Sequence, residues 1–388
     1  MGWKEVDKMS LKKEFIHLAM KRAIPMKTLC ERFHICRPTG YKWIKRYQQE
    51  GEQGLQERPR NPKQCPNETP AKVIDLIVSI RKKHPCWGGR KIQAILKQKG
   101  ISPVPAPSTI SYILKKQGYI NQEEKGKKNY IRFEHEHPNS LWQMDFKGHF
   151  PFATGRCHPL TIIDDHSRFS PCLKACLDEK ANTVKTLLIE VFKKHGLPDR
   201  INVDNGTPWG SLIYVSRYTT LSVWLIELGI QVSYSRPRHP QTNGKAERFH
   251  RTLKAEVLTP HYFHHLKEIQ AAFDAWLEIY NYSRPHEALN MDVPGNRYKP
   301  SYRSYPSAIE EYEYEKDYLL KRVDVRGRLH LNGKQIYVGA PFRGKVIGIR
   351  ETLKDGVREI YFRHQMLGKI DLSLVNKGGS HNLYVNLD

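Results

Sequence analysis

The strongest constraint on the fold is the order of strand-like and helix-like segments between residues 140 and 258. Short apolar segments with strand composition, such as 140–150 and 200–204, alternate with amphipathic helical segments such as 182–196. The predicted order is β-β-β-α-β-α-β-α. This order is typical of an α/β domain in which the ends of strands present side chains at one edge of a sheet.

The sequence on either side of this α/β segment has a different pattern of apolar and polar residues. Residues 10–50 and 71–120 have the pattern of helices joined by short turns, whereas the sequence from about 318 has β pattern with an Asn-Gly turn signal at 332–333. We therefore predict a multidomain chain with N-terminal all-α units, a central α/β core and a small all-β, barrel-like C-terminal domain. The predicted boundaries are 1–52 and 71–120 for two helix-turn-helix units, 53–70 for a Pro/Arg-rich linker, 135–295 for the core with a trailing helix, and 318–388 for the β domain.

The charge of the chain indicates a polyanionic partner. Its 388 residues carry a formal charge of +24, and residues 1–140 hold 29 Lys and Arg against 13 Asp and Glu. Such a surplus is typical of nucleic-acid binding, although a ribosomal or membrane-surface protein can carry the same charge. The seven Cys are scattered without a CxxC pair, which argues against a disulfide framework or a zinc knuckle. Without a long apolar run we expect a soluble, cytoplasmic protein with no membrane partner.

The first helical segment has the pattern of a helix-turn-helix. Pro38 stands where a first helical turn tolerates proline, and Gly51 follows as a helix stop. Tyr41, Ile44 and Tyr47 are expected to form the buried face of the second helix. The outward positions, which we take as candidate DNA contacts, are Arg37, Thr39, Lys42, Lys45 and Arg46. A solvated basic helix in an ordinary three-helix bundle is the alternative.

The linker and the second helical segment add further candidate DNA contacts. Arg58 and Arg60 flank Pro59 and can follow a DNA groove as an extended arm, or belong to a plain spacer. In the second unit Gly100 closes one helix, and Ser108 is the predicted N-cap of the next. The candidate DNA contacts on that helix are Ser108, Thr109 and Lys115.

Three carboxylates stand out by their positions. Asp145 lies in an apolar strand, Asp204 ends another strand before an Asn-Gly pair, and Glu247 lies in the first turns of a basic helix. Singly, Asp145 can be an edge-strand residue and Asp204 a turn former. Helical spacing places a polar row on one face of the last helix and an apolar row on the other. The polar row is Glu247, His250, Arg251 and Lys254, and the apolar row is Ala246, Phe249, Leu253 and Val257.

A carboxylate among cations on a DNA-facing surface weakens binding unless a divalent metal links it to the substrate. We therefore predict that Asp145, Asp204 and Glu247 converge on Mg²⁺ (or Mn²⁺), with two ions in the site. An intrahelical salt bridge between Glu247 and Arg251 is the alternative. Asp164 and Asp165 are rivals of Asp145, but the hairpin pattern favours capping with Ser167 for them.

The chain resembles a known family through a string of motifs in a fixed order. These are WQMDFKG, TIIDDHSRF, VDNGTPWG, LGIQVSYSRPRHPQTNGKAERFHRTLK and YNYSRPHEALNMDVP. The string resembles the bacterial insertion-sequence transposases whose core is like that of retroviral integrases. The resemblance implies a ribonuclease H-like fold for 135–260 and a DDE triad at Asp145, Asp204 and Glu247. It also implies DNA contacts near the triad, at His239, Asn243, Lys245, Arg251 and Lys254.

One departure from the family is the 42 residues between Asp204 and Glu247, more than in retroviral integrases. We expect the extra length, around 207–221, to form a loop outside the core. The resemblance implies an enzyme that binds the terminal repeats of its own element, cleaves 3′ ends and transfers them into target DNA as a dimer or larger assembly at the bacterial nucleoid. A catalytically silent DNA-binding regulator and a nuclease for RNA–DNA hybrids are the alternatives.

Overall fold

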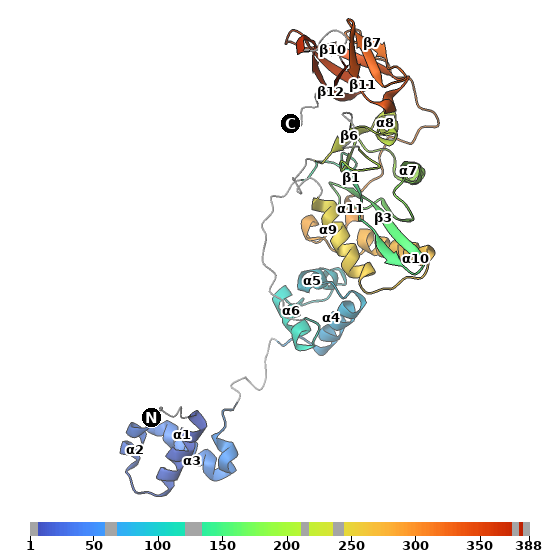
Figure 1. Cartoon of the computed structure of the whole chain (residues 1–388). Helices are drawn as coiled ribbons and strands as arrows, with labels where there is room; N and C mark the ends of the chain where they lie inside the picture. The colour runs from blue at the N-terminus through green and yellow to red at the C-terminus, as the bar shows by residue number, and fades with distance from the viewer. Residues whose placement is uncertain are drawn as a thin grey trace. The chain divides into compact units, whose positions relative to one another are not determined.

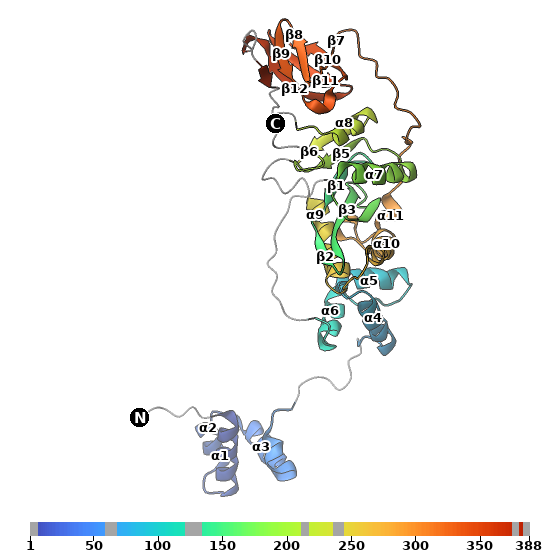
Figure 2. The same cartoon turned by 45° about the vertical axis from the view of Figure 1, so that its right-hand side comes forward.

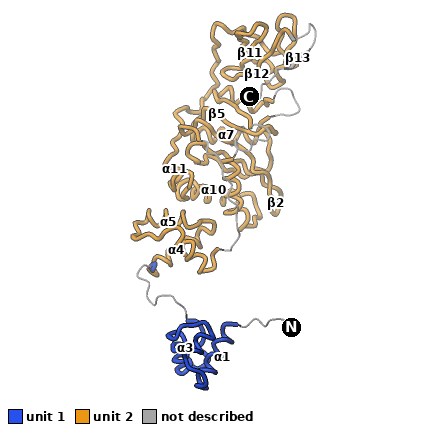
Figure 3. Tube along the Cα trace, turned by 90° about the vertical axis from the view of Figure 1, so that its left-hand side faces the viewer, with its two compact units in different colours: residues 1–69 blue, residues 70–388 orange. Residues whose placement is uncertain are grey.

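The structure is a computed structural model that describes residues 7–58, 68–120, 134–210, 217–235, 244–374 and 380–382. The chain divides into two compact units, residues 1–69 and 70–388, which Figure 3 shows in different colours. No helix in these described ranges is long and apolar enough to cross a membrane.

The first unit is a small helical bundle. Its elements are α1 (Lys8–Met20), α2 (Met26–Arg32), α3 (Arg37–Glu50) and the 3-10 turn η1 (Gly51–Leu55). As predicted, α3 carries proline in its first turn and ends at Gly51, which has a φ of 63°. The buried apolar side chains are Phe15, Ile16, Leu29, Cys30, Trp43 and Leu55.

The buried face of α3 differs from the predicted one. Tyr41 is 57% exposed, so the prediction that it lines the core is wrong. The helix turns Gly40 and Trp43 inward instead, and a Cβ at Gly40 would lie 2.9 Å from both Cys30 Sγ and Phe15 Cζ. Because only glycine permits this close crossing, Gly40 sets which side of α3 faces the bundle.

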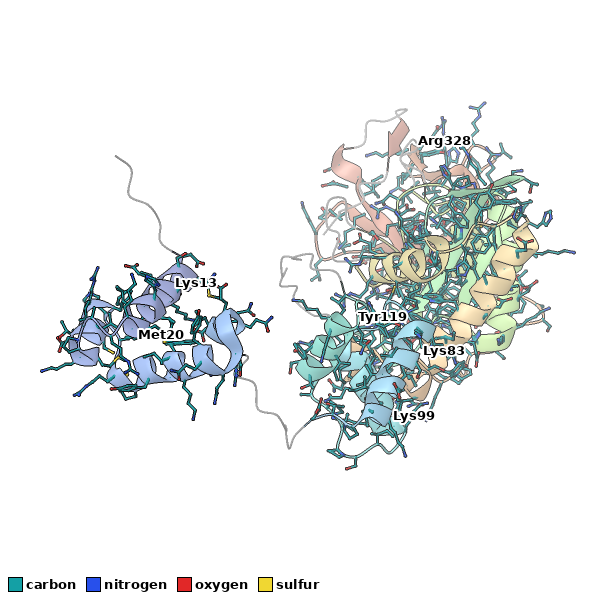
Figure 4. The ribbon with its side chains drawn as sticks, turned by 90° about the horizontal axis from the view of Figure 1, so that it is seen from below. Lys13, Met20, Lys83, Lys99, Tyr119 and Arg328 are labelled. Atoms are coloured by element: carbon teal, nitrogen blue, oxygen red, sulfur yellow. The ribbon has the colours of Figure 1, made fainter. Side chains whose placement is uncertain are left out.

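The second unit begins with three helices, α4 (Ala71–Lys83), α5 (Gly89–Gln98) and α6 (Pro107–Lys116). They pack around a core that includes Ile77, Ile92 and Ile110. Helix α6 begins at Pro107 with Ala106 as its N-cap, so the prediction that Ser108 caps this helix is wrong. Proline fits the first helical position because the amide it lacks has no partner there. Figure 4 shows the side chains of this group, including the labelled Lys83 and Lys99.

The central domain is built on a mixed sheet (Figure 1). Its order is β2-β3-β1-β5-β6, with β4 paired to β3; β1 runs antiparallel to β3 and parallel to β5. The strands are β1 (Trp142–Phe146), β2 (Phe150–Phe152), β3 (Gly155–Asp164), β4 (Cys172–Cys176), β5 (Arg200–Val203) and β6 (Gln231–Tyr234). The predicted order of elements is confirmed, with β2 as an additional short strand.

Helices cover both faces of the sheet. Alternating residues of β1, such as Trp142 and Met144, pack with α7 (Ala181–His195) and α8 (Thr220–Glu227). The opposite face packs against α9 (Gly244–Leu253), the π-helical turn η3 (Lys254–Leu258) and α10 (Leu266–Tyr282). The short elements η4 (Glu287–Leu289) and α11 (Pro294–Arg297) follow.

The C-terminal domain is all-β, as predicted, and it forms two sheets (Figure 2). One has the order β12-β11-β10-β7 and the other β13-β9-β8. The strands are β7 (Leu319–Arg322), β8 (Arg328–Leu331), β9 (Lys334–Tyr337), β10 (Val346–Glu351), β11 (Val357–Phe362), β12 (Gln365–Asp371) and β13 (Ser380–Asn382). The 3-10 turns η5 (Ala340–Phe342) and η6 (Leu372–Leu374) complete it. Asn332 and Gly333 both have positive φ in the predicted turn between β8 and β9.

The extra segment between Asp204 and Glu247 is not wholly outside the core, which corrects the prediction. Its described ends are buried, with Trp209 2% and Tyr218 8% exposed. The Trp209 ring lies 5.6 Å from that of Phe146, and the Tyr218 ring lies 5.5 Å from that of Phe342 in the C-terminal domain. Trp209 therefore packs within the core, whereas Tyr218 packs between the core and the C-terminal domain.

Candidate active site

Two of the three predicted acids lie at the ends of neighbouring parallel strands. Trp142 pairs with Ile201 and Gln143 with Asn202, so the register places Asp145 level with Asp204, the residue that follows β5. Parallel strands end at the same edge of a sheet, and this edge is where open α/β sheets commonly place their functional groups. The sequence predicted both positions.

The third acid is carried by α9. Ala246, Phe249 and Leu253 are buried against the sheet, whereas Glu247 and Arg251 are exposed, as the helical spacing predicts. Among the described residues Glu247 has no ion-pair partner, so the alternative of a salt bridge with Arg251 is not observed.

His250 corrects the predicted polar row. The side chain is largely buried, and its Nε2 lies 2.7 Å from Oγ1 of Thr161 in β3. The same hydroxyl donates to the main-chain carbonyl of Asp145 at 2.9 Å. Burial, followed by the positive charge of Lys147, lowers the pKa of His250 to about 4. His250 is therefore a neutral link between α9 and the strand that carries Asp145, and not part of the outward cationic face.

The site concentrates negative charge in a partly buried place. Burial, then the charges of Asp204, Glu179 and Glu247, raises the pKa of Asp145 to about 7, although a main-chain bond from Phe146 opposes the shift. The pKa of Asp204 is also raised, first by burial and then by Glu179, despite the Gly206 amide that donates to its carboxylate at 3.0 Å. Charges held together in this way are typical of functional sites.

This charge distribution fits a divalent cation. Within the described ranges, Asp145, Asp204 and Glu247 have no cationic side chain as an ion-pair partner, and hard oxygen ligands of this kind suit Mg²⁺. Among the same residues, no group of three or more His, Cys, Asp or Glu side chains is close enough to hold one metal ion. The three carboxylates are therefore of the chemical type that binds Mg²⁺, but they do not form a closed set of ligands in the described residues.

Asp164 and Asp165 have structural partners, as predicted for Asp164. The carboxylate of Asp164 accepts from the Ser167 amide at 2.8 Å and from the Asn139 amide at 2.7 Å. Asp165 is 1% exposed and forms an ion pair with Lys245. Neither aspartate is therefore free to take the metal-binding role predicted for Asp145.

Two further charged residues near Asp145 and Asp204 are not among the predicted site residues. Glu179 follows β4, and its Oε1 lies 2.7 Å from Nδ1 of His158. Lys147 follows Asp145 by two residues, and burial, then the charge of Lys254, lowers its pKa. For Lys147 a signal existed, since a cation two positions beyond a strand acid returns to the same side of the strand. For Glu179 the only signal was an acid just before a predicted helix, which is common for capping alone.

The predicted DNA contacts of α3 lie mainly on its surface. Arg37, Lys42 and Lys45 are exposed, whereas Thr39 and Arg46 are half-buried. Lys42 Nζ and Arg46 Cζ lie 4.6 and 5.1 Å from the centre of the Trp43 ring, which orients both cations. In the linker, Arg58 forms an exposed ion pair with Glu50, and Arg60 lies outside the described residues.

Helix α6 presents a similar face. Ser108, Thr109 and Lys115 are exposed, and Tyr112 between them is 67% exposed. The two helices can be aligned by their buried residues. Gly40 and Trp43 are buried in α3, and Ile110 and Ile113, which are also three residues apart, are buried in α6. Residues at matching outward positions of the two helices are Thr39 with Thr109 and Lys45 with Lys115. Both helices thus expose a lysine at this position, whereas the hydroxyl is exposed at Thr109 and half-buried at Thr39.

The predicted DNA contacts near the triad divide into three groups. Arg251 and Lys254 are exposed. Lys245 is turned into the domain by its ion pair with Asp165. His239 and Asn243 lie outside the described residues.

Family models match successive parts of the chain. Integrase core domain models match residues 135–240 and 228–294. A helix-turn-helix domain matches 11–63, a homeodomain-like domain matches 39–114, and the C-terminal domain of IS481 family transposases matches 319–377.

Curated relatives include proteins of two insertion elements. The uncharacterized 31.7 kDa protein of IS407 from Burkholderia multivorans is 24% identical over 58% of this chain and 78% of its own length. The uncharacterized 39.2 kDa protein of IS476 from Xanthomonas euvesicatoria is 26% identical, with 43% of this chain and 46% of its own length matched. Among solved structures, the catalytic core domain of HTLV-2 integrase in complex with magnesium aligns with a TM-score of 0.32 and 16% identity, over 42% of this chain and 97% of its own.

The central domain, a mixed sheet with helices on both faces, is the part of the chain that the integrase core domain models match. With helix-turn-helix domain models before the core and the C-terminal domain of IS481 family transposases after it, the chain is similar, in the order of its domains, to insertion-sequence transposases with an integrase core.

Proposed function

We propose that this protein binds the terminal inverted repeats of its own insertion element and cleaves and joins DNA there. The observation that carries the proposal is the alignment of Asp145 with Asp204 at one sheet edge, together with the charge of Glu247 acting on Asp145. Asp145, Asp204 and Glu247 are the proposed catalytic residues. Helices α3 and α6 are the proposed readers of the repeat, because each carries cationic and hydroxyl side chains on its surface.

The three acids are also the proposed ligands of two Mg²⁺ or Mn²⁺ ions. When bound, the metal would supply activation of the attacking oxygen and stabilisation of the leaving oxygen in an in-line displacement. The proposal is supported by the alignment of Asp145 with Asp204 at the ends of two neighbouring strands, by the effect of the Glu247 charge on Asp145, and by the absence of a cationic partner for these acids among the described residues. Arg251 on α9 and Lys254 at the start of η3 are exposed, where they suit the phosphates next to the cleaved bond.

The proposed reaction has two displacements at phosphorus. In the first, water attacks the phosphodiester at the element end, and the 3′ oxygen leaves. In the second, this 3′-OH attacks a phosphodiester of target DNA, and the target's own 3′ oxygen leaves, so the number of phosphodiester bonds is conserved. Two element ends must be joined to one target, so a homodimer or a larger assembly on DNA is part of the proposal.

The test is the separation of binding from chemistry. Asp145→Asn removes one carboxylate charge with little change of shape, so we expect cleavage of a labelled element end to be abolished while end binding persists. The comparison needs a binding assay and a nicking assay on the same duplex. Loss of binding together with cleavage would count against the assignment of Asp145 to the catalytic centre.

A further inference from the structure

The buried carboxylate of Asp165 is held by three donors from three parts of the domain. It accepts from the main-chain amide of His135 at 2.9 Å and from Nε2 of Gln143 at 3.0 Å, and it forms an ion pair with Lys245. Nζ of Lys245 also donates to the Asp165 carbonyl at 3.2 Å. An ion that is 1% exposed is costly without a counter-ion, so Lys245 cannot leave Asp165 for solvent or substrate without a penalty.

Gln143 connects this ion pair to the catalytic strand. It lies in β1 two residues before Asp145, on the same face of the sheet, and is 3% exposed. While its Nε2 donates to Asp165, its Oε1 accepts from the amide of Ala246 at 3.2 Å. This amide belongs to the first turn of α9, where amides have no partner within the helix. One side chain of β1 therefore caps α9 and orients Asp165.

These contacts converge on the residue that precedes Glu247. We propose that Gln143, Asp165 and Lys245 form a clamp that holds the first turn of α9 on β1 and so positions Glu247 relative to Asp145. In this account, which rests on the proposed function, Lys245 is a positioning residue and not a DNA contact. A basic residue beside a catalytic acid otherwise suggests phosphate binding, but the three side chains turn toward one another inside the domain.

The clamp gives α9 its second fixed point on the sheet. The first is the contact of His250 with Thr161, which lies opposite Asp145 in β3. The two contacts lie on consecutive turns of α9, and Glu247 lies between them in the sequence. Fixing a helix at two points removes both its rotation and its translation along the strand, which a reaction sensitive to ångström-scale misplacement requires.

The experiment compares Lys245→Met, Asp165→Asn and Gln143→Met with wild type in the full-length protein. The control is Lys345→Met, which removes an ion pair with Glu227 between α8 and the C-terminal domain and leaves α9 untouched. Cleavage is measured across a range of Mg²⁺ concentrations, and end binding across a range of salt concentrations. The clamp predicts cleavage at least about tenfold slower in all three variants, with end affinity and its salt dependence unchanged. The double variant Lys245→Met/Asp165→Asn should be no slower than Lys245→Met alone, because the two residues act as one unit.

A direct contact of Lys245 with DNA would give a different set of results from the clamp. If Lys245 is a DNA contact, Lys245→Met lowers end affinity and reduces the salt slope by about one, whereas Asp165→Asn and Gln143→Met cleave like wild type. If Lys245→Met does not fold, the cleavage rate of Gln143→Met tests the clamp, because this variant loses the amide contacts and keeps the ion pair. If wild type itself does not cleave, the proposed function fails; the clamp is then tested alone by hydrogen exchange, since Gln143→Met must speed exchange of the Ala246 amide.

Discussion

The hydroxyl of Thr161 donates a hydrogen bond of 2.9 Å to the main-chain carbonyl of Asp145, the residue directly opposite it in the sheet. Since His250 contacts the same hydroxyl, this bond ties the position of α9 to the strand that carries the first acid. The position of the proposed catalytic residues Asp145 and Glu247 therefore depends on the Thr161 hydroxyl, which bonds to neither carboxylate.

Thr161→Val should slow cleavage without weakening end binding. Valine keeps the shape of threonine but loses the hydroxyl, so both His250 Nε2 and the connection to Asp145 lose their partner. We expect cleavage about tenfold slower, since small displacements of catalytic groups are costly. Thr161→Ser, which keeps the hydroxyl, is the matched control and should remain close to wild type. Equal losses in both variants would show that packing, and not the hydrogen bond, is what matters.

Asp145→Asn should stabilise the protein at alkaline pH when divalent metal is chelated. The ordinary pKa of 3.8 rises to about 7 in the folded protein, so the folded state holds this proton more tightly than the unfolded state. Stability contributed by the group is therefore lost as pH rises from about 4 to about 7, and the cost is complete above that range. Removing the charge should add about 2–4 kcal/mol at pH 8 and almost nothing at pH 4. Thermal unfolding at both pH values measures the difference.

Mg²⁺ should make wild type more stable than Asp145→Asn, which is the reverse of the order expected without metal. A ligand that binds only the folded state stabilises it by an amount that rises with the logarithm of its concentration above Kd, and wild type keeps all three carboxylates. We expect Mg²⁺ at pH 8 to raise the unfolding temperature of wild type and to have little effect on Asp145→Asn. An equal rise in both proteins would mean that the ion binds elsewhere.

Lys45→Ala and Lys115→Ala should each weaken binding to element ends. Both lysines are exposed at matching positions of α3 and α6, and each lost phosphate contact should reduce the slope of log affinity against log salt by about one. Lys193→Ala on the exposed face of α7 is the control for the loss of one surface charge. A slope that is unchanged in both variants would place the DNA on other faces of the two units.

Gly40→Ala should destabilise the first unit. The added methyl group would lie 2.9 Å from Cys30 Sγ and from Phe15 Cζ, so the bundle must shift, at a cost of about 1–3 kcal/mol. Hydrogen exchange of the α3 amides in the full-length protein measures this cost. Gly88→Ala is the matched control, because a Cβ there meets nothing within 4 Å.

Much of the site could be predicted from the sequence because its determinants are local. The strand that contains Asp145, the turn after Asp204 and the helical spacing around Glu247 are each set by a few neighbouring residues. The side of α9 that carries Glu247 was correct for the same reason, since Phe249 and Leu253 fix the buried face.

The sequence does not predict the position of a side chain when a contact with a residue far away in the chain determines it. His250 resembles Arg251 in the sequence as an outward polar residue, but its contact with Thr161, 89 residues away in the chain, draws it inward. Lys245 likewise has a partner that the local sequence does not indicate, Asp165, 80 residues away. Tyr41 was misplaced because the closest helix crossing is at Gly40, a residue with no apolar side chain to signal it. The burial of Tyr218 is not visible in the local sequence, because the domain that covers it follows much later in the chain.

The most direct test of the central claim is an incubation of purified protein with Mg²⁺ and a labelled duplex that carries the element's end, for wild type and for Glu247→Gln. The account predicts metal-dependent nicking and joining by wild type, and neither reaction by Glu247→Gln despite normal end binding. A tight and specific complex without cleavage by either protein would contradict it and would indicate a DNA-binding regulator.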